Sequence, residues 1–169
     1  MPRHQTIIHP LQPLFQTDSK ILILGSFPSV KTREYGFFYG HPQNRFWPLL
    51  ERIFGESPGA DIEARRAFLL KHHIAVYDVI YQCDIIGSSD ASIQNVVPSD
   101  LGPIFKKANI RRVFCNGGTA YRFYRKYQEQ KTGVEALRLP STSPANAGFS
   151  MDVLYSQWKG IRADIEVRN

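Results

Sequence analysis

Short apolar segments alternate with amphipathic segments along this chain, and no other feature of the sequence constrains the fold as strongly. The apolar segments have the length of buried strands, while the segments between them repeat apolar residues every three or four positions. Strands separated by helices pair in parallel through right-handed crossovers. The sequence therefore predicts an α/β fold, a three-layer α/β/α sandwich with a four-stranded parallel sheet, whose strands span about residues 20–25, 74–80, 110–115 and 134–139.

The helices are predicted from their apolar periodicity and from residues typical of helix ends. The first begins near Asn44 and ends at Gly55, a residue that commonly terminates helices. Ser99 is predicted to be the N-cap of a helix that runs to Ala108. Further helices are predicted over about residues 61–72, 120–127 and 154–165, and loops are predicted over 26–43 and 82–97.

A single domain over residues 1–169 is expected, because this length is enough to bury a sizeable core without disulfides. Residues 1–19 contain three prolines and few periodic apolar residues. We predict that they form an ordered leader packed on the body of the domain.

The composition narrows the class of partner and the compartment. There are 21 Lys and Arg residues against 15 Asp and Glu, a net charge of +6, which favours polyanionic partners. No apolar run is long enough for a transmembrane helix, and His4, Gln5 and His9 interrupt the region where a signal peptide would be apolar. We expect a cytoplasmic protein without a membrane partner.

The two cysteines, Cys83 and Cys115, lie far apart and form no CxxC pair. This spacing argues against an iron–sulfur cluster and against a cysteine-based zinc site. We predict that both are reduced, buried thiols.

A ligand site is predicted where loops follow the strands, because open α/β sheets bind ligands beyond the carboxyl ends of their strands. The motifs of dinucleotide oxidoreductases, P-loop NTPases, α/β-hydrolases and zincins are absent from the sequence. Aromatic rings and side-chain amides dominate instead, without any carboxylate, and they suit a flat, neutral, hydrogen-bonding nucleobase. The segments concerned are GSFPS at 25–29, GFFYGHPQNRFW at 36–47, Asn116-Gly117-Gly118 and STSPANA at 141–147.

Structural roles for the same residues remain open. Phe37, Phe38 and Tyr39 could belong to the core rather than to a stacking surface. Asn116 before two glycines could form a turn, and Asn44 could cap the helix that it opens.

The segments resemble the motifs of the uracil-DNA glycosylase superfamily. In its mismatch-specific branch the first motif reads GINPG, followed by a phenylalanine and HPxNRFW. The hypoxanthine-DNA glycosylase branch is more similar, with GSFPS-type first motifs, an Asn-Gly pair after the third strand and a final PSTSPANA motif. All of these occur here in the same order, at Gly25–Ser29, His41–Trp47, Asn116-Gly117 and Pro140–Ala147, over nearly the whole chain.

The resemblance implies a uracil-DNA glycosylase-like fold without metal or cofactor. It also implies that the protein acts as a monomer on double-stranded DNA containing deaminated bases. The damaged nucleotide would be flipped out of the duplex into the pocket. Phe27 stands where relatives keep a water-activating Asp or Asn, so the resemblance assigns catalysis to Asn44, which would position the attacking water. No lysine nucleophile lies in these motifs, which favours direct hydrolysis.

The resemblance also implies the other site residues. Ser26 and Phe27 would face the base through backbone N–H groups, Tyr39 would stack on it, and Asn116 would read its edge. His41 and Ser141 complete the base-binding set, with Ser141 standing where many relatives keep His or Asn. The predicted DNA contacts are Lys31, Arg33, Arg45, Ser143, Ala145 and Asn146.

Three functions follow as hypotheses. The first is a glycosylase that removes hypoxanthine from DNA. The second is a uracil-specific or mismatch-specific glycosylase of the same superfamily. The third is a non-enzymatic nucleic-acid or nucleotide-binding module, which Phe27 keeps open because its ring cannot polarise water.

Overall fold

A four-stranded parallel sheet lies at the centre of the structure, a computed structural model that describes residues 3–166. All of its neighbouring strands run parallel, in the order β3-β2-β6-β7. The two strands β2 and β3 are buried at every residue, as expected for strands covered on both faces. The four predicted strands are thus confirmed as β2 (Ile21–Gly25), β3 (Ile74–Asp78), β6 (Arg112–Asn116) and β7 (Ala136–Leu139).

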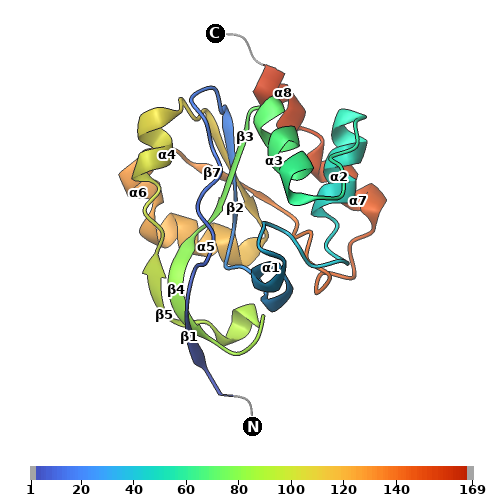
Figure 1. The fold of residues 1–169 in the computed structure, drawn as a ribbon. Helices are drawn as coiled ribbons and strands as arrows, with labels where there is room; N and C mark the ends of the chain where they lie inside the picture. The colour runs from blue at the N-terminus through green and yellow to red at the C-terminus, as the bar shows by residue number, and fades with distance from the viewer. Residues whose placement is uncertain (1–2, 167–169) are drawn as a thin grey trace.

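Helices cover both faces of this sheet, which confirms the three-layer α/β/α prediction. Figure 1 shows α4, α5 and α6 on one side and α2, α3, α7 and α8 on the other. Their bounds are α2 (Phe46–Phe54), α3 (Ile62–Lys71), α4 (Gly102–Lys107), α5 (Gly118–Tyr127), α6 (Glu129–Thr132), α7 (Met151–Trp158) and α8 (Ile161–Glu166).

The helix α2 illustrates why helices can be predicted from the spacing of apolar residues. Phe46, Leu49, Leu50 and Ile53 all face the core, at the predicted spacing of three and four. The helix ends where Gly55 adopts a left-handed conformation with a φ of 66°.

The C-terminal helix is divided in two, contrary to the prediction of one continuous helix. Its four apolar positions were predicted correctly, since Leu154, Trp158, Ile161 and Ile165 are all buried. The break falls at Gly160, between α7 and α8, where a glycine weakens helix continuation.

The predicted loop over 82–97 is wrong for half of its length, because residues 82–85 and 94–97 belong to a second, antiparallel sheet with the order β1-β4-β5. The predicted strand over 74–80 runs into it: β3 ends at Asp78 and the next strand begins at Ile80. Irregular register between β4 and β5, together with their partial exposure, obscures the period in the sequence. The elements are β1 (Gln5–Ile8), β4 (Ile80–Ile85), the 3-10 turn η1 (Asp90–Ser92) and β5 (Gln94–Pro98).

The leader contributes β1 to this second sheet, where it pairs with β4. Further along, Leu14 forms an isolated bridge with Val76 and so covers the outer edge of β3. Residues 1–2 of the predicted leader, and 167–169 at the other end of the predicted domain, lie outside the described residues.

Two further local predictions are wrong. The helix α1 (Val30–Tyr35) occupies part of the predicted 26–43 loop and is too short to show a period. It is capped by Ser29, whose Oγ accepts from Thr32 N at 3.1 Å. Ser99 is not an N-cap, because α4 begins after Leu101 and Ser99 is instead buried, with its N–H donating to Val79 O.

Candidate active site

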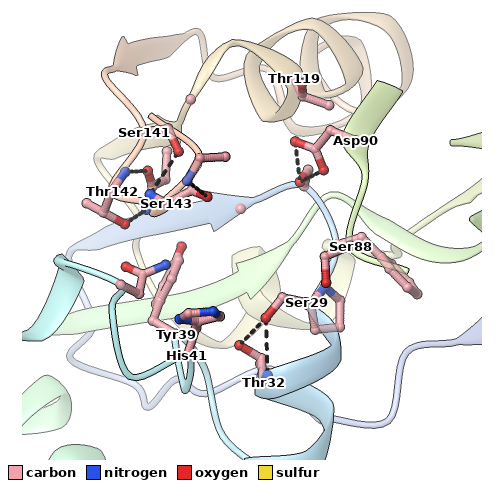
Figure 2. Close-up of a pocket in the computed structure, with 18 of the residues that line it drawn as sticks. Ser29, Thr32, Tyr39, His41, Ser88, Asp90, Thr119, Ser141, Thr142 and Ser143 are labelled. Atoms are coloured by element: carbon pink, nitrogen blue, oxygen red, sulfur yellow. Dashed lines mark hydrogen bonds between the residues drawn. The ribbon is translucent and has the colours of Figure 1, made fainter. Parts of the chain in front are cut away.

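A pocket of about 560 Å³ opens at the carboxyl end of the parallel sheet. Figure 2 shows Tyr39 and His41 together on one wall, with Ser141, Thr142 and Ser143 on another and Asp90 beside Thr119 on a third. Segments that are far apart in the sequence therefore meet at one site, as the strand-end argument predicts.

The sheet floor of the pocket is formed where β2 and β3 end side by side. Gly25 and Asp78 are paired in the parallel register. A Cβ atom on Gly25 would lie 2.5 Å from Asp78 Oδ1 and 3.3 Å from the Tyr39 hydroxyl oxygen. Only glycine leaves room for these two polar groups at the base of the pocket.

Tyr39 is held by ring stacking on the core. Its ring lies 3.9 Å from that of Phe46, with an interplanar angle of 22°. Burial, and next the negative charge of Asp78, raise the pKa of Tyr39 well above its usual range. The hydroxyl therefore stays protonated and can donate a hydrogen bond.

Asn44 lines the pocket and also shapes the start of α2. Its Oδ1 accepts from the backbone N–H of Phe46, the first residue of α2, at 2.9 Å, although the N-cap residue of this helix is Arg45 rather than Asn44. This bond uses one lone pair of the oxygen, so the second lone pair and the amide hydrogens are the groups that Asn44 can offer to a ligand. Nearby, Nδ1 of His41 accepts from Gln43 N at 3.0 Å.

Asn116 holds the loop at 140–147 against the end of β6. Its Oδ1 accepts from Thr142 N at 3.0 Å and its Nδ2 donates to Thr142 Oγ1 at 3.0 Å. One of the two amide hydrogens is enough for the second bond, so the other can serve a ligand in the pocket.

Arg45 holds the same loop through further hydrogen bonds. Its guanidinium donates to the carbonyl oxygens of Asn146, at 2.9 Å, and Phe149. The backbone N–H of Arg45 donates to Thr142 O at 3.1 Å. These bonds couple the HPQNRFW segment to the STSPANA segment.

Gly117 is required between β6 and α5. It has a φ of 98°, and a Cβ atom there would lie 3.1 Å from the Cβ of Ser141. We expect Gly117→Ala to lower the free energy of unfolding by about 1–3 kcal/mol through backbone strain and the contact with Ser141. Urea denaturation measures this loss.

Gly160→Ala is the matched control, because no atom lies within 4 Å of a Cβ placed there. Its effect on stability should stay within about 0.5 kcal/mol. Equal losses in the two variants would contradict the proposed strain at Gly117.

Two carboxylates line the pocket although none occurs in the four predicted segments. Asp78 Oδ2 lies 2.7 Å from Nε2 of His9, which belongs to the leader. Asp90 accepts from the Ser26 hydroxyl at 3.1 Å. As a whole residue Asp90 is exposed, but loss of water around its carboxyl raises its pKa, partly offset by hydrogen bonds from Ser26 and Thr119.

Sequence signals for these carboxylates exist but are weak. Asp78 is a charged residue at the end of an otherwise apolar strand, next to a glycine on the neighbouring strand. Asp90 lies in the Gly-Ser-rich segment 87–90, which was predicted to be plain loop.

The comparisons with known proteins agree with this geometry. The family profile described as "UDG: Uracil DNA glycosylase superfamily" matches residues 12–159. The chain belongs to the uracil DNA glycosylase superfamily.

Individual relatives in the superfamily have similar lengths. A protein named hypoxanthine DNA glycosylase from Methanosarcina acetivorans is 30% identical over 145 residues, which cover 85% of this chain and 90% of the relative. A protein of the same name from Methanosarcina barkeri is 31% identical over 115 residues, 62% of this chain and 68% of the relative. A solution NMR structure from Methanosarcina acetivorans, assigned provisionally as a uracil DNA glycosylase, matches with a TM-score of 0.81 and 28% identity, covering 95% of this chain and 100% of the other.

Most of the residues that the superfamily resemblance implied are brought together by the fold. Three of the thirteen, Arg33, Arg45 and Asn146, do not line the pocket. The other ten do: Ser26, Phe27, Lys31, Tyr39, His41, Asn44, Asn116, Ser141, Ser143 and Ala145.

The basic residues predicted to meet phosphates differ in their surroundings. Lys31 is exposed at the pocket, and its Nζ lies 3.7 Å from Glu34 Oε2. The Arg33 guanidinium lies 5.8 Å from the centre of the Phe27 ring, and burial lowers the pKa of Arg33. Lys31 is thus the cation of this set best placed to reach DNA, while Arg33 and Arg45 are engaged within the protein.

The two cysteine predictions are confirmed. Cys83 and Cys115 are buried and free. Burial raises the pKa of Cys83 to about 11 and that of Cys115 to about 12, so neither forms a reactive thiolate. No helix within residues 3–166 is long and apolar enough to span a bilayer.

Proposed function

We propose that this chain is a monofunctional DNA glycosylase that flips a deaminated base, foremost hypoxanthine from deoxyinosine, out of duplex DNA and hydrolyses its N-glycosidic bond in base excision repair. The pocket carries this proposal: four separated segments converge on one cavity whose volume of about 560 Å³ admits a purine and its sugar. Two relatives named hypoxanthine DNA glycosylase support the choice of base.

The pocket chemistry fits a flipped purine. Hypoxanthine has a carbonyl oxygen that accepts hydrogen bonds and a ring N–H that donates one. The amides of Asn44 and Asn116 and the protonated hydroxyl of Tyr39 can donate, while the carboxylate of Asp90 can accept. The base would be recognised by groups that are already fixed by Phe46, Thr142 and the helix start.

The reaction is a substitution at C1′ of the sugar. The bond from C1′ to the base breaks, the electron pair leaves with the base, and water adds its oxygen to C1′. The proton that water releases balances the proton that the departing base takes up. Asn44 would position the water, and amide donors including Asn116 would stabilise the charge on the base.

The DNA partner is proposed to be a duplex containing a deaminated base. The chain would act on it as a single-domain monomer, and a cytoplasmic location stays a prediction from the sequence. Ser143 and Ala145 would lie against the phosphates of the flipped nucleotide, because both reach the pocket from the 140–147 loop.

Duplexes that carry one inosine, uracil, xanthine or mismatched thymine test the proposal. After incubation with the protein, alkali cleaves the strand wherever a base has been removed. We expect cleavage of the inosine duplex above all, and none of an undamaged duplex. Cleavage of only uracil or thymine duplexes would identify a uracil or mismatch enzyme, and cleavage of none would leave a binding module.

A further inference from the structure

The mechanism above does not use the buried carboxylate of Asp78, which lines the pocket at the end of β3. The superfamily resemblance places a polar catalytic group at position 27, and Phe27 cannot act as one. We propose that Asp78, oriented by His9, supplies the negative charge that stabilises the positively charged sugar as the glycosidic bond breaks. This inference rests on the proposed glycosylase function.

The position of Asp78 supports a direct role in the pocket. It is the last residue of β3, paired in register with Gly25, the last residue of β2. Its Oδ1 lies 2.5 Å from the point that a Cβ on Gly25 would occupy, and its side chain is only 7% exposed. The missing side chain of Gly25 therefore leaves this oxygen open to the pocket rather than shielded by protein.

The hydrogen bonds of His9 define how its ring contacts Asp78. Nδ1 of His9 accepts from the backbone N–H of Leu11 at 3.1 Å, so this nitrogen carries a lone pair. The ring is therefore neutral, and its single N–H, on Nε2, donates to Asp78 Oδ2 at 2.7 Å. A neutral donor orients the carboxylate without cancelling its negative charge.

Aromatic rings keep the His9–Asp78 pair in place and away from water. The His9 ring centre lies 4.7 Å from that of Tyr77 and 5.9 Å from that of Phe27, and the His9 side chain is fully buried. A charge in such surroundings acts strongly on a nearby cation because little water screens it. Phe27 then has a part in the site as a wall of this pair.

The other titratable groups at the pocket are less suited to the role. Asp90 lies on the exposed η1 turn and accepts from Ser26 at 3.1 Å, and burial of its carboxyl raises its pKa. Tyr39 stays protonated and neutral because its pKa is raised. Asp78 is therefore the anion that the described pocket residues hold most rigidly.

A pair of abasic duplexes tests the charge directly and without turnover. One duplex carries a pyrrolidine in place of the sugar, which is cationic, and the other carries a neutral tetrahydrofuran of similar shape. We expect the wild-type protein to bind the cationic duplex at least about tenfold more tightly, by fluorescence anisotropy. Asp78→Asn should lose most of this preference and at least about 100-fold in single-turnover base removal.

The His9 variants separate positioning from general destabilisation. His9→Gln keeps an N–H donor for Asp78 and should retain most of the preference, whereas His9→Phe should lose it. Asp84→Asn is the matched control: Asp84 also ties the leader to β4, through the Thr6 hydroxyl, but it does not line the pocket. It should bind both duplexes as the wild type does.

Several results would overturn the inference. They are an absent cation preference in the wild type, an unchanged preference in folded Asp78→Asn, or a loss caused by Asp90→Asn and not by Asp78→Asn. If Asp78→Asn does not fold, an unchanged preference in folded His9→Phe decides against it. Failure to remove any base would refute the proposed function and with it the catalytic role of Asp78, whereas loss of the cation preference alone would refute only the role of Asp78.

Discussion

Asn44→Ala is expected to slow single-turnover base removal from an inosine duplex by about 100-fold to 1000-fold, because the amide that positions water is lost. The variant should still fold, with a loss of about 1 kcal/mol in the free energy of unfolding, since Asn44 Oδ1 also accepts from Phe46 N. Rapid-quench kinetics with excess protein measures the first effect and urea denaturation the second.

Asn44→Ser separates the two roles of this residue. A serine hydroxyl can still accept the hydrogen bond from the Phe46 N–H but has no amide to offer to the pocket. We expect Asn44→Ser to be as stable as the wild type and nearly as inactive as Asn44→Ala. Full activity in either variant would move the water-positioning role to another residue.

Phe46→Ala is expected to lower the free energy of unfolding by about 3–5 kcal/mol, the largest loss of stability that we predict. Phe46 is fully buried and lies in edge-on contact with Trp47 and Trp158, at ring distances of 4.9 Å and 6.2 Å. It also stacks on Tyr39 at 3.9 Å. Affinity for an inosine duplex should fall together with stability, because Tyr39 loses the ring that fixes it.

Phe123→Ala serves as the control for this substitution. Phe123 is half-buried on α5, where it stacks on Tyr127 at 6.0 Å and has the Arg122 guanidinium 5.1 Å from its ring centre. Its removal should cost about 1–2 kcal/mol and leave duplex affinity unchanged. Equal effects of the two substitutions would show that Phe46 has no special part in supporting the site.

The sequence predicts the helices and strands whose residues are buried in a regular pattern. The strand Ile21–Gly25 is buried on both faces, and α2 repeats its apolar residues at helical spacing, so both are evident from the sequence. The second sheet is not evident from the sequence, since β4 and β5 are partly exposed and their pairing shifts register. The helix α1 is too short to display a period.

In the candidate site, the residues could be predicted from the sequence but their contacts could not. Most of the site residues could be named from the sequence because they lie in contiguous motifs, and ten of the thirteen named line one pocket. The hydrogen-bond partners of these residues could not be named from the sequence. That Arg45 holds carbonyl oxygens of the loop about 100 residues later follows only from how the two segments pack.

From the sequence alone one can derive the α/β alternation, the strand ends where a ligand binds and the superfamily motifs, because all of these are encoded in local patterns. The tertiary structure adds the carboxylates. His9 and Asp78 are 69 residues apart and form a hydrogen bond of 2.7 Å only because the leader returns along β4 and past the end of β3. No local pattern encodes such a contact, since it depends on the path of the chain between the two sheets.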